Sequence, residues 1–216
     1  IIKKLTKEEV YHCYKDKDGV KVFLDDYAYL VQLMINFYEI TGELNYLNDA
    51  KVMAQKTWDL FYDKSNKILQ KNLIDENDLF VPPSDVNDSN IPNGNSIFLL
   101  SCKKLEAITG DLKWQNITKE LSQSFHSFLN LQSTQMVSYI KNMDMCEHLQ
   151  TFTFFGDINK YKELHQYVKK KYLKLSTLIY KEDPKENYLI VCKNQTCSNK
   201  IKTIEELNLV VKNYAI

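Results

Sequence analysis

The chain has 216 residues, of which 44% are hydrophobic and 26% charged, and its basic and acidic side chains balance to a net charge of zero. This length and composition are those of a globular protein with one sizeable core, or of one domain followed by a small second one. The balanced charge provides no general attraction to nucleic acid, and no apolar run is long enough to cross a membrane, so we expect neither as a partner.

The N-terminal residues and the cysteines indicate where the chain comes from. It opens with Ile1-Ile2, without an initiator Met or a secretion signal, and it contains five cysteines. An odd number of cysteines without such a signal favours a reducing, cytoplasmic setting. We therefore expect a fragment of a longer cytoplasmic protein.

The first third of the sequence predicts a β-hairpin and then two helices. The hairpin is expected over residues 10–24, around an Asp18-Gly19 turn. Asp25 then stands where a helix N-cap is expected. Apolar residues recur at helical spacing up to Gly42, which fits the left-handed position that ends a helix, and a second helix is expected over residues 44–62.

The middle of the sequence repeats this pattern after a long irregular stretch over residues 63–94. A third helix is expected to start after Asn95 or Ser96 and to end at Gly110, followed by helices over residues 112–131 and 135–148. A helix, a glycine and an immediate second helix form an αα-hairpin, and the pattern occurs around Gly42 and again around Gly110. Stacked hairpins form a solenoid or a closed toroid. Two hairpins and one extra helix are too few to close a toroid.

The last 68 residues follow a different pattern. Strands are expected over residues 151–157, 175–180 and 188–193, with a helix over residues 159–172. Thr203 and Glu206 form a capping box that starts a last helix. We therefore expect two units, a partial α/α-toroid domain over residues 1–148 and a small α/β subdomain over residues 149–216.

Polar side chains gather at the expected starts of the first and third helices. Asp25 and Asp26 begin the first helix, and the residues before the third helix are Asp85, Asp88, Asn93 and Asn95. Because stacked hairpins are near-parallel copies, these side chains are expected on one rim. Carboxylates and amides are typical of sugar-binding sites, where one carboxylate acts as general acid and another as base. The alternative is that they only cap helices and form turns.

Two cysteines close together in the tail admit two interpretations. Cys192 and Cys197 follow an expected strand with four residues between them. They are either buried thiols in a turn or a pair that forms a disulfide. A zinc site would need two more ligands, and no second close pair of Cys or His exists, so neither a metal site nor a cofactor is expected.

Several short motifs, in the same order, resemble those of one family. The matching segments are Leu24–Ala28, Leu60–Asp63, Pro92–Ser96, Leu105–Gly110, Phe155–Asp157 and Val191–Cys197. Together they resemble the C-terminal region of thioredoxin-domain-containing proteins of the spermatogenesis-associated type, over about residues 20–212. Asn93 and Asn87 depart from the Ser and the Tyr that are usual there.

This resemblance implies a helical domain similar to six-hairpin glycosidases and sugar epimerases, with a thioredoxin-like domain upstream in the same chain. Together with the cluster of carboxylates at the helix starts, it makes Asp26 and Asp88 the candidate acid and base. The expected substrate-binding residues are Asp25, Tyr27, Asp85, Asn93 and Asn95. The expected ligand is a carbohydrate or another small molecule. The alternative is a non-catalytic interaction module that supports the thioredoxin-like domain, with Cys192 and Cys197 as its redox partner or as a covalent staple.

Overall fold

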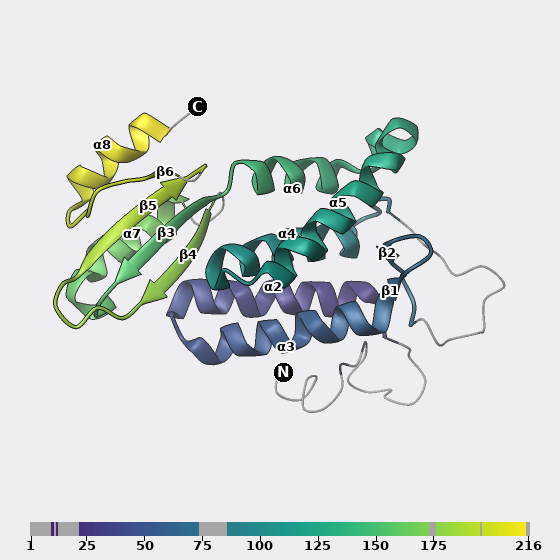
Figure 1. The fold of residues 1–216 in the computed structure, drawn as a ribbon, viewed down its shortest axis with the longest axis horizontal. Coiled ribbons are helices and arrows are strands. Elements are labelled where there is room, and N and C mark those ends of the chain that lie inside the picture. The colour runs from purple at the N-terminus through teal and green to yellow at the C-terminus, as the bar shows by residue number, and fades with distance from the viewer. Residues whose placement is uncertain are drawn as a thin grey trace.

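A computed structural model describes most of the chain, and it is mainly helical with a small sheet (Figure 1). The described residues are 10, 12, 22–73, 86–172, 176–194 and 196–214. The helical part consists of α2 (Leu24–Thr41), α3 (Leu44–Phe61), α4 (Gly94–Thr109), α5 (Leu112–Gln132), the short η1 (Ser133–Gln135) and α6 (Val137–Glu147). No helix in the described part of the chain combines the length and the apolar character needed to cross a lipid bilayer.

The two expected helical hairpins are confirmed, as α2–α3 and α4–α5. Gly42 and Gly110 end the first helix of each with φ of 77° and 71°, and their amides donate to the carbonyls of Tyr38 and Glu106. Helix α4 packs against α2, α5 and α6, and Figure 1 shows α2, α4 and α6 starting at the same end of the molecule. A closed toroid is not seen in these helices, so the toroid stays a prediction.

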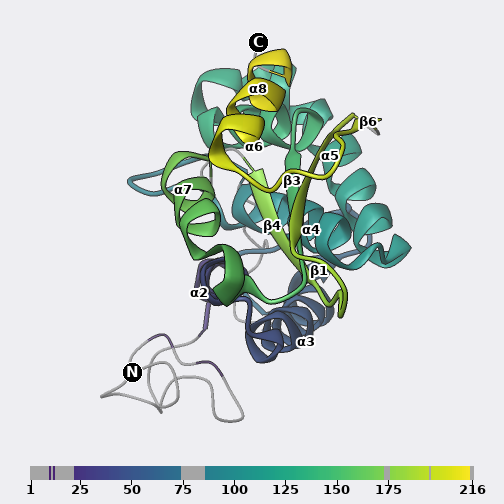
Figure 2. The ribbon, with the colours of Figure 1, turned by 90° about the vertical axis from the view of Figure 1, so that its left-hand side faces the viewer.

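The tail has the expected order of a strand, a helix, two strands and a helix. The elements are β3 (Gln150–Phe155), η2 (Ile158–Tyr161), α7 (Lys162–Tyr172), β4 (Ser176–Lys181), β5 (Tyr188–Lys193), β6 (Thr196–Cys197) and α8 (Ile204–Tyr214). The sheet order is β4-β3-β5-β6 (Figure 1). Strands β3 and β4 are parallel across the α7 crossover, which lies beside β4 in Figure 2, and β5 is antiparallel to both β3 and β6.

Buried polar contacts join the sheet to the helices. Glu39 of α2 is fully buried, and its carboxylate lies 2.8 and 3.0 Å from Nζ of Lys104 on α4. The hydroxyl of Thr177 on β4 donates to the same carboxylate over 2.7 Å. Ile179 of β4 lies in the hydrophobic cluster of the helices, and Tyr180 packs against both that cluster and the cluster of the sheet. The C-terminal end of α2 is therefore fixed to β4.

Two expected helix starts were wrong. Asp25 is not the N-cap of α2, because the helix begins at Leu24 and Phe23 occupies the cap position. Helix α4 begins at Gly94, and its N-cap is Asn93, whose side chain accepts from the amide of Asn95 over 2.9 Å. In both cases a polar residue in the first turn of the helix has the sequence pattern of an N-cap. Only the backbone conformation distinguishes the N-cap from a residue of the first turn.

Two other stretches differ from, or lie outside, the expectation. The β-hairpin expected over residues 10–24 lies mostly outside the described residues, and Leu24 belongs to α2. The stretch after α3, expected to be irregular, starts with a short antiparallel ladder of β1 (Tyr62–Asp63) and β2 (Ile68–Leu69). Residues 74–85, which include Asp85, are outside the described part of the chain.

Candidate functional site

The starts of α2 and α4 meet at the end of the helices that is remote from the sheet (Figure 1). The hydroxyl of Tyr29 on α2 donates to the carbonyl of Pro92 over 3.0 Å, just before α4 begins. A Cβ added to Gly94 would lie 2.5 Å from Oδ1 of Asp25. The two helix starts are therefore neighbours, but the expectation that all of their polar side chains share one rim is wrong for Asn95, which is fully buried.

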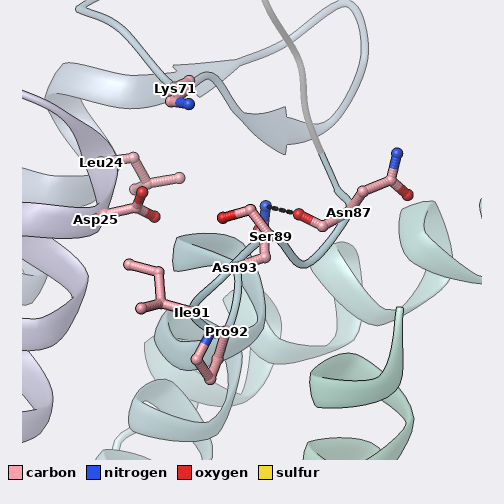
Figure 3. A pocket seen from close by; sticks show the side chains of 8 residues that line it. All are labelled: Leu24, Asp25, Lys71, Asn87, Ser89, Ile91, Pro92 and Asn93. Atoms are coloured by element: carbon pink, nitrogen blue, oxygen red, sulfur yellow. Dashed lines mark hydrogen bonds between the residues drawn. The ribbon is translucent and has the colours of Figure 1, made fainter. Parts of the chain in front are cut away.

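A small cleft of about 40 Å³ lies between the two helix starts (Figure 3). The side chain of Asp25 lies on one wall, the loop before α4 forms the opposite wall, and Lys71 stands at the top of the view. The lining residues are Leu24, Asp25, Lys71, Asn87, Ser89, Ile91, Pro92 and Asn93. This volume has room for a water molecule or an ion but not for a sugar.

A larger cleft of about 540 Å³ adjoins the small one. The two share Asp25, Lys71 and Ile91. The larger cleft is lined by Val10, His12, Phe23, Asp25, Asp26, Tyr29, Leu30, Lys71 and Ile91. Its volume lies within the range of pockets that take small molecules, and its mixture of apolar floor and a few polar groups is typical of them.

Asp26, one of the two proposed acid/base residues, lines the larger cleft and also holds the helix start. Its carboxylate accepts from the amide of Phe23 over 3.0 Å, which is the reach-back of a capping residue. Nδ1 of His12 lies 2.9 Å from both carboxylate oxygens. Asp26 thus has a structural task at the start of α2.

Asp88, the second proposed acid/base residue, is a clamp between the loop before α4 and the start of α6. Its carboxylate accepts from the amide of Asn93 over 2.9 Å and from the amide of Ser138 over 2.7 Å. The hydroxyl of Ser138 donates to it as well. Three donors therefore occupy this half-buried carboxylate.

The amides predicted to bind substrate have structural contacts too. Asn95 is fully buried, and its side chain accepts from the amide of Leu69 over 2.9 Å and donates to the carbonyl of Leu69 over 2.8 Å. The side chain of Asn93 caps α4 and also donates to the carbonyl of Asn87. Asn95 therefore fixes β2 to α4, while half-buried Asn93 still lines the small cleft.

The tyrosines of α2 have roles that differ from the expectation. Tyr27, the predicted substrate-binding tyrosine, is 5% exposed and packs edge-on against Phe61 with ring centroids 5.5 Å apart. Tyr29, which the sequence reasoning missed, lines the larger cleft instead. Desolvation raises the pKa of Tyr29, and the negative charges of Asp25 and Asp88 raise it further, so its hydroxyl keeps its proton.

Tyr29 could have been found from the sequence, whereas Lys71 could not. Tyr29 lies four residues after Asp25, and residues at that spacing share one face of a helix. Lys71 is exposed and reaches the clefts from the segment after β2. Its backbone carbonyl accepts from the amide of Leu24 over 2.9 Å, a tertiary contact without a local sequence signal.

The tail cysteines form a disulfide, so the interpretation as buried thiols was wrong. Cys192 and Cys197 are bonded, and neither is buried.

No three His, Cys, Asp or Glu side chains within the described ranges are placed so that they could hold a metal ion. The sequence matches no model of a known protein family and no curated protein.

Replacing Gly94 with alanine tests the close approach of the two helix starts. The added Cβ would meet Oδ1 of Asp25 at 2.5 Å, Cγ of Leu24 at 3.0 Å and Cα of Asp25 at 3.3 Å. We expect the free energy of unfolding in urea to fall by about 1–3 kcal/mol. Asp25→Ala removes the nearest obstacle, so the double variant should recover part of the loss. Equal stability of Gly94→Ala and the parent chain would contradict this packing.

Proposed function

We propose that the chain is a carbohydrate-binding module and that its site is the larger cleft beside the start of α2. The observation that carries the proposal is the meeting of Asp25, Lys71 and Tyr29 over an apolar floor in a cleft of about 540 Å³. A sugar presents hydroxyl groups around its edge and C–H groups on its faces. The carboxylate accepts from hydroxyls, the lysine donates to them, and the rings of Phe23 and Tyr29 offer apolar contact to a C–H face.

Binding is favoured over catalysis because the carboxylates of the proposed acid and base already accept structural hydrogen bonds. Asp88 is held by three donors from Asn93 and Ser138. Asp26 holds the amide of Phe23 and lies against His12. General acid–base catalysis needs a group that is free to exchange a proton with substrate. Asp25 lines both clefts.

The sequence motifs support a wider context for this module. We propose that the helices are part of an incomplete α/α toroid similar to those of sugar-processing enzymes. In this proposal the chain is the C-terminal part of a thioredoxin-domain-containing protein of the cytoplasm. The carbohydrate class of ligand draws on this resemblance as well as on the cleft.

Replacing Asp25 with asparagine tests the proposed site. We expect affinity for the best sugar of a mono- and disaccharide panel to fall about 10- to 100-fold, because a hydrogen bond to a charged group is replaced by a neutral one. The free energy of unfolding should change by less than about 1 kcal/mol, because asparagine keeps the shape of the aspartate side chain and removes only its charge from the first helical turn. Isothermal titration calorimetry with the 216-residue chain measures the affinity.

The matched control is Asp49→Asn on the exposed surface of α3, outside both clefts, which should leave affinity unchanged. No heat of binding with any sugar in the panel would count against the proposal and favour the alternative of an interaction module. Equal losses in the Asp25 and Asp49 variants would place binding elsewhere.

A further inference from the structure

The disulfide of the tail lies on the exposed edge of the sheet. It joins Cys192 on β5 to Cys197 on β6, which face each other in the antiparallel ladder with Cα atoms 4.0 Å apart. Strand β6 is the edge strand of the sheet and both of its residues are exposed. Cys192 is half-buried. A reagent in solution therefore has access to this bond, and first of all to the sulfur of Cys197.

The chain around the disulfide is held by contacts that do not need it. The amide of Ser198 donates to the carbonyl of Val191 over 2.8 Å, and the hydroxyl of Ser198 accepts from the amide of Val191. Further on, Leu189 and Ile201 exchange two backbone hydrogen bonds of 2.8 and 2.9 Å. Ile201 is 1% exposed and lies in the hydrophobic cluster of the sheet. The segment after β6 is thus anchored to β5 at two points, Ser198 and Ile201.

The position of the bond also limits what it adds to stability. The two cysteines are only 5 residues apart in sequence. A disulfide stabilises a fold chiefly by restricting the unfolded chain, and the effect grows with the length of the loop that it closes. A loop this short, with flanking segments already anchored, gives the disulfide a small share in the fold. Stability therefore does not explain why an exposed disulfide is present at this position.

We propose that Cys192–Cys197 is a site of thiol–disulfide exchange that is reduced by a dithiol while the domain stays folded. A thiolate of the dithiol attacks Sγ of Cys197 and forms a mixed disulfide, and the sulfur of Cys192 leaves as a thiolate that takes up a proton. The second thiol of the dithiol, as thiolate, then attacks the first sulfur of the dithiol, which is bonded to Cys197 in the mixed disulfide. This releases Cys197, which also takes up a proton.

In total the dithiol loses two electrons and two protons, and the cysteine pair gains them. The reaction fits a dithiol protein or a small dithiol, because both resolve the mixed disulfide within one molecule. Attack at Cys197 is preferred because that residue is exposed, whereas Cys192 is half-buried on β5, which lies between β3 and β6. This inference is independent of the sugar-binding proposal, since the bond lies at the end of the molecule that is remote from the two clefts (Figure 1).

Graded reduction of the native chain tests whether exchange occurs without unfolding. The chain is incubated with increasing dithiothreitol, quenched with an alkylating reagent and weighed by mass spectrometry, while circular dichroism follows the fold. We expect the reduction rate to rise in proportion to dithiothreitol, with the spectrum unchanged. The Cys192→Ser and Cys197→Ser variants should melt less than about 8 °C below the parent chain. A reduction rate that is independent of dithiothreitol, equal to the unfolding rate, would overturn the proposal.

A trapping experiment tests which sulfur is attacked. The chain is mixed with a reduced thioredoxin-type protein whose second active-site cysteine is replaced by serine, and then alkylated. We expect an adduct in which Cys197 carries the protein and Cys192 carries the alkyl group. The matched controls are the two serine variants, kept reduced, which have no bond to exchange and should form no adduct. The absence of an adduct from the parent chain, or one through Cys192, would overturn the assignment.

Discussion

Replacing Lys104 with methionine is expected to lower the free energy of unfolding by about 3–5 kcal/mol, the loss typical of a broken buried ion pair. Lys104 is 9% exposed, and its ammonium group lies 2.8 and 3.0 Å from the carboxylate of fully buried Glu39. Without the lysine, this carboxylate would keep only the hydroxyl of Thr177 and a long contact from the amide of Leu178. Urea denaturation followed by circular dichroism measures the loss.

The neighbouring lysine supplies a matched control for this prediction. Lys103 pairs with Glu106 over 2.9 Å on the same helix, and both side chains are only half-buried, so Lys103→Met should cost less than about 1 kcal/mol. Adding Glu39→Gln to Lys104→Met removes the unpaired buried charge and should restore part of the stability. If both lysine variants lost the same small amount, Glu39 and Lys104 would not join the helices to the sheet as described.

Replacing Asp88 with alanine is expected to lower the free energy of unfolding by about 2–4 kcal/mol, because three donors lose a charged acceptor. Two of them are the amides of Asn93 and Ser138, and the third is the hydroxyl of Ser138. The loop before α4 and the start of α6 would then lose their common anchor. Thermal and urea denaturation of the variant provide the measurement.

The control for Asp88 is Asp59→Ala, which removes a carboxylate whose partner is Gln55 one turn away on α3. That loss should stay below about 1 kcal/mol. Unchanged stability of the Asp88 variant, together with the loss of a sugar-cleaving activity in the 216-residue chain, would contradict the structural role. It would favour the acid/base role that the sequence motifs imply for Asp88.

The helical hairpins could be predicted from the sequence because their signals are local. Apolar residues at helical spacing end at Gly42 and Gly110, and the left-handed conformation of these two residues is what a glycine permits most easily. The capping box of α8 is local as well, and the contacts between Thr203 and Glu206 are present. The expected order of strands and helices in the tail follows from the same kind of pattern.

The contacts that fix the rim could not be predicted because their partners are distant in sequence. Asn95 resembles an N-cap, yet its amide bonds the backbone of Leu69, 26 residues earlier. Asp88 resembles a turn residue, yet two of its donors belong to Ser138, 50 residues later. Such side chains show their role only when tertiary structure brings their partners to them.

The buried ion pair and the disulfide show the same limit in a different form. Lys104 lies in the middle of a helix, where lysine is ordinarily exposed, and its partner Glu39 is 65 residues away. Cys192 and Cys197 were compatible with thiols or with a disulfide, because sequence spacing does not fix the distance between side chains. The register of β5 with β6 sets them opposite each other.

The measurement that tests the central claim most directly is a ¹⁵N-resolved NMR titration of the chain with the sugar panel. Binding in the larger cleft predicts shifts of the amide signals of residues 23–30 at the start of α2, and of Lys71 and Ile91, which also line the cleft. The signals of β5 and β6, at the other end of the molecule, should not move. Shifts confined to the sheet, or no shifts with any sugar, would contradict a carbohydrate-binding cleft at the helix starts.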